Sequence, residues 1–235
     1  DRPWYRKYDP GVPYHIEYPP VPLHYFLEQS ARKYPDRPCT IFKGAKVTYR
    51  QMNELSDRLA AGLAGLGVKK GSLVGIFMPN SPQFVLAFYG VLKAGGIVVA
   101  TNVTYTPREI EHQMNDCGAE VMLVMSNFYP KIKEVQPRTR IKTVVVTNIK
   151  EYLPGAVRLL FTLFKEKKDG HRVELQAGDV WMQDLLSKYA SEARPKVGVT
   201  ADDDAVFQYS GGTTGIPKAA IGLHRNLVAN TLQIR

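Results

Sequence analysis

The sequence predicts an α/β fold with a largely parallel sheet flanked by helices on both faces. Short β-branched runs, such as SLVGIFMP at 72–79 and KTVVVT at 142–147, alternate with longer segments of helical periodicity. These runs are apolar at consecutive positions, which is typical of strands buried on both faces of a parallel sheet. With 235 residues, 44% of them hydrophobic, the chain is long enough to bury a substantial core.

The first third of the chain precedes this alternation. Residues 1–22 are rich in proline and aromatic side chains, which predicts an extended arm. Residues 23–70 are expected to be helical, with a first helix at 23–33. A capping box formed by Thr48 and Gln51 opens a second, longer helix that runs through Leu66 and is stopped by Gly67. We expect this helical segment to pack on a part of the domain that lies beyond the chain.

Residues 71–235 are expected to form the α/β part of the fold. Ser81 followed by a proline, and a second capping box at Thr106 and Glu109, indicate helix starts. The strands are expected at 72–79, 96–101, 119–125, 142–147 and 205–209, and the helices at 81–94, 106–118, the 130s and 179–189. A polar connector at 190–204 leads to the last of these strands.

The segment 151–169 has a different character. Val157, Leu160, Phe161 and Phe164 share one helical face, and a cluster of lysines follows them. Such a helix can lie on a membrane surface, with its apolar side down and its basic end near the lipid headgroups. It can equally pack on the core with a solvated, charged end. The sequence leaves both interpretations open.

Bulk composition narrows the classes of function. The net charge of +9 suits an anionic partner or a generally basic surface. The sequence contains no cluster of basic residues interleaved with aromatics, so nucleic-acid binding is not predicted. Cys39 and Cys117 are isolated and lack metal-ligand spacing, so no zinc site is expected. No signal-peptide core and no apolar run of about 20 residues occurs. We expect a cytoplasmic protein, at most peripheral to the inner face of the membrane.

The stretch YSGGTTGIPK, residues 209–218, follows a predicted strand and precedes a predicted helix. Its glycines allow backbone N–H groups to approach an anion closely. The hydroxyls of Ser210, Thr213 and Thr214 add hydrogen-bond donors, and Lys218 adds a positive charge. Since ligands of open α/β sheets bind beyond the carboxyl ends of strands, this combination predicts a phosphate-binding loop.

The loop matches neither of the two common nucleotide-binding motifs. In a Walker A loop the lysine directly follows the last glycine and precedes Ser or Thr. Here Ile216 and Pro217 separate Gly215 from Lys218, and Ala219 follows the lysine. The dinucleotide fingerprint G-x-G-x-x-G is also absent from the loop.

The stretch YSGGTTGIPKAA resembles the phosphate-binding signature of the adenylate-forming superfamily. The similarity covers nearly the whole chain, is carried by residues 47–96 and 202–230, and is greatest to bacterial long-chain acyl-CoA synthetases. The resemblance implies part of the large amino-terminal domain of an acyl-CoA synthetase-like fold. Two positions depart from the family pattern: Ala219 replaces a usual glycine, and Val103 stands where proline is common.

The resemblance also implies a reaction and its cofactors. A long-chain fatty acid would be activated by ATP as an acyl-adenylate and transferred to coenzyme A. By this resemblance, Lys218, Thr213 and Thr214 are the candidate catalytic residues. The candidate ATP-binding residues are Tyr209, Ser210, Gly211, Gly212, Thr213, Thr214, Gly215 and Lys218. Mg²⁺ and coenzyme A are expected to bind mostly to parts beyond this chain, which itself is expected to supply no metal ligand.

Members of this family are more than twice as long as the chain. It is therefore expected to be an amino-terminal fragment, inactive alone, without the carboxy-terminal lid domain. Two alternatives stay open. The acid could be an aryl, short-chain or amino acid, or the chain could be a non-catalytic nucleotide-binding module. Such a module could form a homodimer through the arm at 1–22. His224 is expected to start or pack a helix rather than to act in catalysis.

Overall fold

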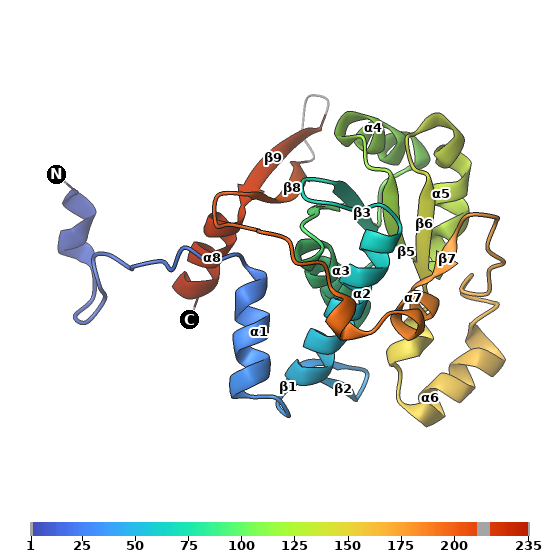
Figure 1. Ribbon diagram of the computed structural model, residues 1–235, viewed down its shortest axis with the longest axis horizontal. Helices are drawn as coiled ribbons and strands as arrows, with labels where there is room; N and C mark the ends of the chain where they lie inside the picture. Colours follow the sequence, from blue (N-terminus) through green and yellow to red (C-terminus); the bar gives the residue numbers. More distant parts are fainter. Residues whose placement is uncertain (1, 211–216, 235) are drawn as a thin grey trace.

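The computed structural model describes residues 2–210 and 217–234, and its centre is a seven-stranded sheet (Figure 1). The strand order is β7-β6-β5-β3-β4-β8-β9. The strands are β3 (Leu73–Phe77), β4 (Ile97–Ala100), β5 (Val121–Met125), β6 (Thr143–Thr147), β7 (Val180–Trp181), β8 (Asp204–Ser210) and β9 (Lys218–Leu223). Neighbouring strands are parallel except for the antiparallel pair β8–β9.

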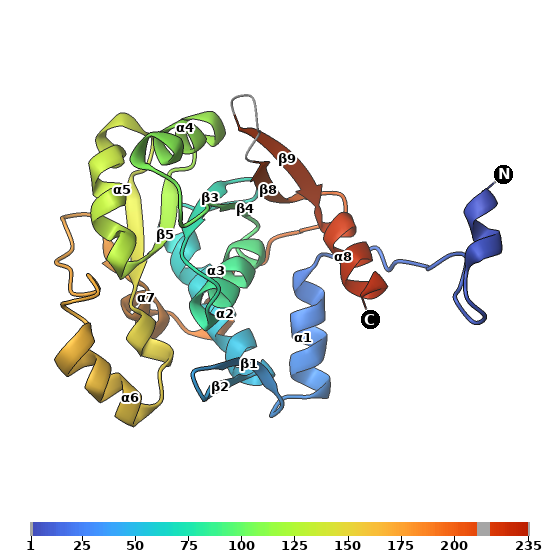
Figure 2. The ribbon, with the colours of Figure 1, turned by 180° about the vertical axis from the view of Figure 1, so that it is seen from behind.

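Helices cover both faces of the sheet, as Figure 2 shows from behind. One face packs on α1 (His24–Lys33), α2 (Tyr49–Gly65), α3 (Pro82–Lys93), α7 (Met182–Lys188) and α8 (His224–Gln233); the other packs on α4 (Pro107–Cys117) and α5 (Tyr129–Val135). Side chains of β6 alternate between the two cores: Val145 faces the first, and Val144 and Val146 face the second. The predicted largely parallel α/β sheet, covered on both faces, is confirmed.

The helix starts follow the local signals in the sequence. Thr48 Oγ1 accepts a hydrogen bond from Gln51 N–H at 3.2 Å, and Gln51 Oε1 accepts one from Thr48 N–H at 2.9 Å. Thr106 and Glu109 form the same reciprocal pair before α4, which ends at Gly118 in the left-handed conformation, with φ of 69°. Both predicted capping boxes are confirmed.

The predicted helical segment 23–70 is interrupted between α1 and α2, where the sequence analysis predicted no strand. Strands β1 (Pro38–Phe42) and β2 (Ala45–Thr48) form a separate antiparallel hairpin there. Its turn places Lys43 at φ 50° and Gly44 at φ 89°. A two-residue turn of this kind requires positive φ, which is common for glycine and uncommon for lysine. In the sequence, Gly44 therefore signals the turn and Lys43 does not.

The predicted helix directly after the glycine-rich stretch is also wrong. Residues Lys218–Leu223 instead form β9, which pairs antiparallel with β8, and α8 begins only at His224. The predicted helix at 179–189 likewise begins later, because its first residues form the short strand β7 beside β6. In both places pairing with a neighbouring strand overrides local helix preference.

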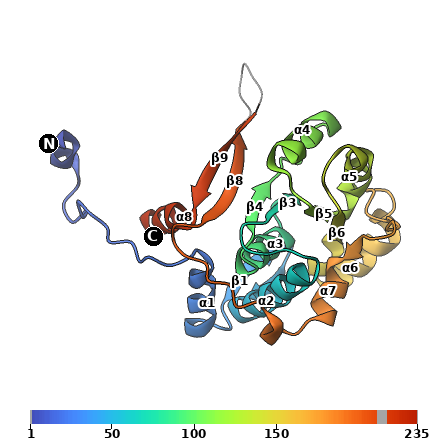
Figure 3. The same cartoon turned by 45° about the horizontal axis from the view of Figure 1, so that its top comes forward.

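The two ends of the segment 1–70 differ in how they pack against the sheet. The arm contains a short 3₁₀ helix, η1 (Pro3–Lys7), and leads away from the sheet (Figures 1 and 3). In contrast, α2 buries Leu59 and Leu63 in the same core as α3 and the sheet. The segment 23–70 therefore shares the core of the sheet, and its packing on further chain stays a prediction.

After β6 the chain forms η4 (Ile149–Tyr152), α6 (Gly155–Leu160) and a π-helical turn, η5 (Phe161–Lys165). Within the described residues, α6 and η5 leave Val157, Leu160 and Phe164 exposed to solvent rather than packed in either core. No helix in the described ranges is both long enough and apolar enough to cross a membrane.

Candidate phosphate-binding site

The strand order brings the predicted loop to the carboxyl edge of the sheet. After β3 the chain passes through α3 on one face to reach β4, and after β4 it passes through α4 on the other face to reach β5. This change of face is a topological switch point, where open α/β sheets form their ligand crevice. Strand β8 lies parallel to β4, so its carboxyl end, at Ser210, reaches the same edge.

Ser210 and Lys218 are brought together as partners in the ladder between β8 and β9, and both are exposed. The residues between them carry the predicted donors. Gly211, Gly212, Thr213, Thr214 and Gly215 lie outside the described residues, and the roles predicted for them stay predictions.

Tyr209 is positioned differently from its neighbour Ser210. Its side chain is buried in the core on the α4 side, and its hydroxyl donates a hydrogen bond to Asp116 Oδ2 at 2.5 Å. Burial, together with the nearby Asp116 carboxylate, raises the pKa of Tyr209 above its ordinary value. The hydroxyl thus forms its hydrogen bond with α4, and this contact fixes the end of β8.

A cleft of about 520 Å³ opens between the carboxyl ends of β3, β4 and β8. It is lined by Met78, Pro79, Asn80, Phe84, Ala100, Thr101, Asn102, Val103, Tyr105, Gln208 and Tyr209. Thr101 is 6% exposed, and its Oγ1 has no hydrogen-bond partner among the described residues. A buried, unpaired hydroxyl in a cleft wall suits a polar ligand.

Sequence reasoning did not assign the polar residues of this cleft to the site. Asn80 follows β3, Thr101 and Asn102 follow β4, and Gln208 lies on β8. A signal was present, because Asn80 and Asn102 each come just after a predicted strand and Thr101 is the last residue of one. These residues lie close together only because β3, β4 and β8 are neighbours in the sheet, however, and a local sequence pattern does not predict the order of strands.

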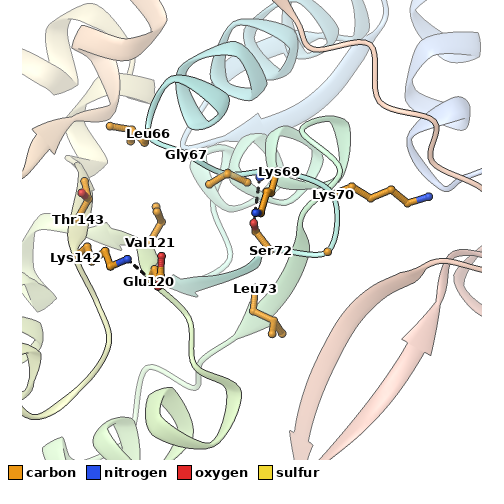
Figure 4. Close-up of a pocket in the computed structure, with 12 residues that line it drawn as sticks. Leu66, Gly67, Lys69, Lys70, Ser72, Leu73, Glu120, Val121, Lys142 and Thr143 are labelled. Atoms are coloured by element: carbon orange, nitrogen blue, oxygen red, sulfur yellow. Dashed lines mark hydrogen bonds and ion pairs between the residues drawn. The ribbon is translucent and has the colours of Figure 1, made fainter.

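A second, more basic pocket lies at the opposite, amino edge of the sheet and is drawn in Figure 4. Two of the three lysines that line it, Lys70 and Lys142, have partners among the described residues. Lys142 pairs with Glu120 at 2.9 Å. Lys70 points away from the other lining residues, and its Nζ lies 2.8 Å from Asp203 Oδ2 and 2.8 Å from the carbonyl of Gly198. Because the parallel strands all end at the opposite edge, we assign the phosphate site to the cleft there, beside the end of β8.

His224 is the first residue of α8 and directly follows the end of β9 that is opposite to Lys218. It is 1% exposed, and its Nδ1 accepts a hydrogen bond from the Leu23 N–H at 3.1 Å. Burial lowers the pKa of His224 to about 4, so the imidazole is neutral at pH 7. The predicted structural role is confirmed, since the ring connects α8 to the start of α1.

Within residues 2–210 and 217–234, no group of three or more His, Cys, Asp or Glu side chains is arranged to hold a metal ion. Cys39 and Cys117 are unpaired thiols, each partly buried. Burial raises the pKa of both, which makes them poor nucleophiles at neutral pH.

An open parallel sheet with a cleft at its carboxyl switch point places the chain in the class of ligand-binding α/β proteins. Residues 27–235 match the family model described as AMP-binding enzyme. The chain belongs to this family of adenylate-forming enzymes.

The chain resembles several acid–CoA ligases. It is 34% identical over 232 residues to a long-chain-fatty-acid–CoA ligase of Bacillus subtilis, covering 98% of the chain and 41% of the relative. A more distant match is a 4-coumarate-CoA ligase of Narcissus pseudonarcissus, 32% identical over 216 residues, covering 91% of the chain and 35% of the relative. Among solved structures, a long-chain-fatty-acid-CoA ligase from Archaeoglobus fulgidus aligns with a TM-score of 0.76 and 26% identity, covering 97% of the chain and 41% of that structure. The chain thus spans about two fifths of the length of the long-chain relatives.

Proposed function

We propose that this chain is the amino-terminal, phosphate-binding portion of an enzyme that activates a long-chain fatty acid with ATP and transfers it to coenzyme A. One observation carries the proposal. Ser210 and Lys218 are ladder partners at the carboxyl edge of the sheet, and Tyr209, next to Ser210 in the chain, lines the cleft at the switch point. Family membership and the long-chain relatives support the choice of reaction and substrate.

In the proposed reaction, a carboxylate oxygen attacks the α-phosphorus of ATP. A P–O bond to the β-phosphate breaks, and pyrophosphate leaves with the electron pair. In the second half, the thiolate of coenzyme A attacks the acyl carbon and AMP departs. The carboxylate is already an anion, so the first step needs no general base. The barrier comes from charge that accumulates on phosphate oxygens, which positioned donors stabilise.

The residues of this chain would contribute positioning and charge. Lys218 would neutralise the departing pyrophosphate, and Ser210 would donate a hydrogen bond to the same phosphates, together with the donors predicted at 211–215. Thr101 fits a polar part of the substrate, because its buried hydroxyl lines the cleft without a partner among the described residues. Magnesium would balance phosphate charge when bound, with its ligands and most of the coenzyme A site supplied by chain beyond residue 235.

A second candidate substrate class is an aryl acid, which the similarity to a 4-coumarate-CoA ligase favours. Both candidates use the same chemistry at the loop and differ only in the acyl pocket. For either one we propose a cytoplasmic enzyme, because ATP and coenzyme A are substrates of this reaction.

The deciding experiment measures acid-dependent pyrophosphate release by the complete gene product. Palmitate, acetate, benzoate and amino acids are compared, each with and without coenzyme A. We expect release with palmitate and formation of palmitoyl-CoA.

Release with benzoate alone would retain the adenylation chemistry and replace the substrate class. Absence of release with every acid, from protein that still binds ATP, would overturn the enzyme assignment and leave a nucleotide-binding module.

A further inference from the structure

An unusual patch of apolar side chains lies on α6 and η5, which form one continuous stretch at the lower end of the molecule in Figures 1 and 2. The patch is defined by large apolar side chains that are each between 43% and 72% exposed and outside both cores. Its members are Val157 at 43%, Leu159 at 60%, Leu160 at 57%, Leu163 at 65% and Phe164 at 72%. Five such residues within eight positions are far more than the scattered exposed side chains of an ordinary surface.

The helical stretch is held in place at its end by buried polar contacts. Glu166 is 7% exposed, and its Oε1 lies 2.5 Å from Lys150 Nζ and 2.9 Å from Asn148 Nδ2. His171 Nδ1 lies 2.8 Å from the buried hydroxyl of Ser126. These contacts fix the stretch on the body of the protein, so its apolar side faces solvent as part of the folded state.

The β1–β2 hairpin extends the same surface. Phe42 at the end of β1 and Lys43 in the turn line a shallow apolar groove together with Leu160 and Phe164. The groove has a volume of about 520 Å³. The groove is therefore built from two segments distant in sequence, and the missed hairpin is one of them.

Basic side chains surround the patch. Residues 150–172 contain six Lys or Arg and three Asp or Glu, a net charge of +3. Two of the acids are paired within this segment, Glu151 with Arg158 and Glu166 with Lys150. Lys43 and Lys165 lie at the rim of the groove, and Lys167, Lys168 and Arg172 are exposed after it.

We propose that this patch docks on the surface of an anionic phospholipid bilayer. Apolar side chains would enter the boundary between headgroups and acyl chains, while the lysines around them contact lipid phosphates. The charge favours this occupant over a second copy of the chain, because two identical basic surfaces would repel each other. Docking goes beyond the proposed reaction, although it would bring a fatty-acid enzyme to the phase in which long-chain acids dissolve.

The first test removes the apolar contacts. Co-sedimentation of the complete gene product is measured with vesicles of phosphatidylcholine and phosphatidylglycerol. We expect Leu163→Ser/Phe164→Ser to weaken partitioning roughly tenfold or more, since both side chains are exposed and available for insertion. The matched control is Ile221→Ser on β9, 57% exposed and remote from α6 in all three ribbon views, which should partition like wild type. Unchanged thermal unfolding of each variant shows that it is folded.

The second test removes charge. Lys167→Gln/Lys168→Gln should weaken binding to the anionic vesicles by about fivefold per lysine, and added salt should reduce the difference. The control Arg108→Gln/Arg140→Gln removes two charges at and beside α4, which lies at the other end of the molecule from α6. It should leave partitioning close to that of wild type.

Three results would overturn the proposal. They are no binding of wild type to anionic vesicles, equal losses in patch and control variants, and a dimer that Leu163→Ser/Phe164→Ser converts to monomer without any change in vesicle binding. The last would assign the patch to a second copy of the chain. Because vesicle binding is measured without substrates, it fails or succeeds independently of the proposed reaction.

Discussion

Two lysines of this chain, Lys93 and Lys218, show opposite uses of a positive charge. Lys93 ends α3 and is 1% exposed, and its Nζ donates hydrogen bonds to the Asn53 carbonyl at 3.0 Å, Asn53 Oδ1 at 2.9 Å and Asp57 Oδ1 at 2.9 Å. Lys218 is exposed at the first position of β9, opposite Ser210. The first charge is used to join helices, whereas the second lies where an anion can reach it.

The region around Lys93 is a network rather than a single pair. Arg194 bonds both Asp57 at 3.1 Å and Glu28 at 2.6 Å, which connects α1, α2 and the connector after α7. Burial lowers the pKa of Lys93, and the Asp57 carboxylate opposes that effect. A buried charge is tolerated only with such partners, so this region should respond to mutation through stability and the loop region through activity.

The largest expected effect follows from removing the buried charge. Lys93→Ala should destabilise the chain by about 3–5 kcal/mol, because Asp57 loses a partner and a cavity forms between α2 and α3. Urea unfolding measures the change. Lys93→Met fills the cavity without the charge and should recover part of the loss. A loss below about 1 kcal/mol for Lys93→Ala would make the two lysines equivalent and contradict the comparison.

At the loop, Lys218→Ala should lower the rate of pyrophosphate release by about 10²–10³-fold, which corresponds to about 2.7–4 kcal/mol of transition-state stabilisation. The side chain is exposed, so the free energy of unfolding should stay within about 0.5 kcal/mol of wild type. Pyrophosphate release and urea unfolding are measured on the same preparation. Equal loss of both would give Lys218 a structural role instead.

Acid should weaken the Lys93 side of the molecule through two buried histidines. Burial, with nearby Arg194, lowers the pKa of His24 to about 3, and burial lowers that of His224 to about 4. Both are near 6.5 when unfolded, so between about pH 6.5 and pH 4 the unfolded state binds more protons. Stability should therefore fall as the pH is lowered through this window, by roughly 3 kcal/mol for His224 alone. In His224→Asn, the free energy of unfolding measured with urea should fall less between pH 6.5 and pH 4 than in wild type. An unchanged pH dependence would exclude His224 as the cause of the decline.

The smallest effect is expected at the amino-edge pocket of Figure 4. Lys142 is 70% exposed in its pair with Glu120, and exposed pairs contribute about 0–1 kcal/mol. Lys142→Gln should leave both pyrophosphate release and the free energy of unfolding almost unchanged. A large loss of activity would move the phosphate site to this edge of the sheet.

Local chemistry explains most of what the sequence predicted. Capping boxes at Thr48 and Thr106 start helices wherever they occur, and β-branched runs become strands that alternate between two cores. The errors are strands held by pairing. Strand β9 contains Ala219, Ala220 and Gly222, which are weak strand formers, and it exists because β8 lies beside it.

For the same reason, only part of the candidate site can be proposed from the sequence. The glycines, hydroxyls and Lys218 form a compact motif that could be recognised by its composition. Thr101 could not, because its importance comes from burial without a partner and from the adjacency of β4 and β8, both of which are properties of the folded chain. The exposed patch on α6 was found as a helical face, but its continuation onto the β1–β2 hairpin required the structure.

The ladder contact between Ser210 and Lys218 has a consequence for affinity. The pairing of Ser210 with Lys218 holds together the two residues that flank the glycine-rich stretch. The conformational entropy of bringing these two residues together is therefore lost when β8 and β9 pair, and not when a ligand binds. Nucleotide affinity should then depend on how firmly β9 pairs with β8. A substitution that frays this hairpin would weaken binding while the rest of the sheet stays folded, and it would mimic loss of a phosphate contact without touching one.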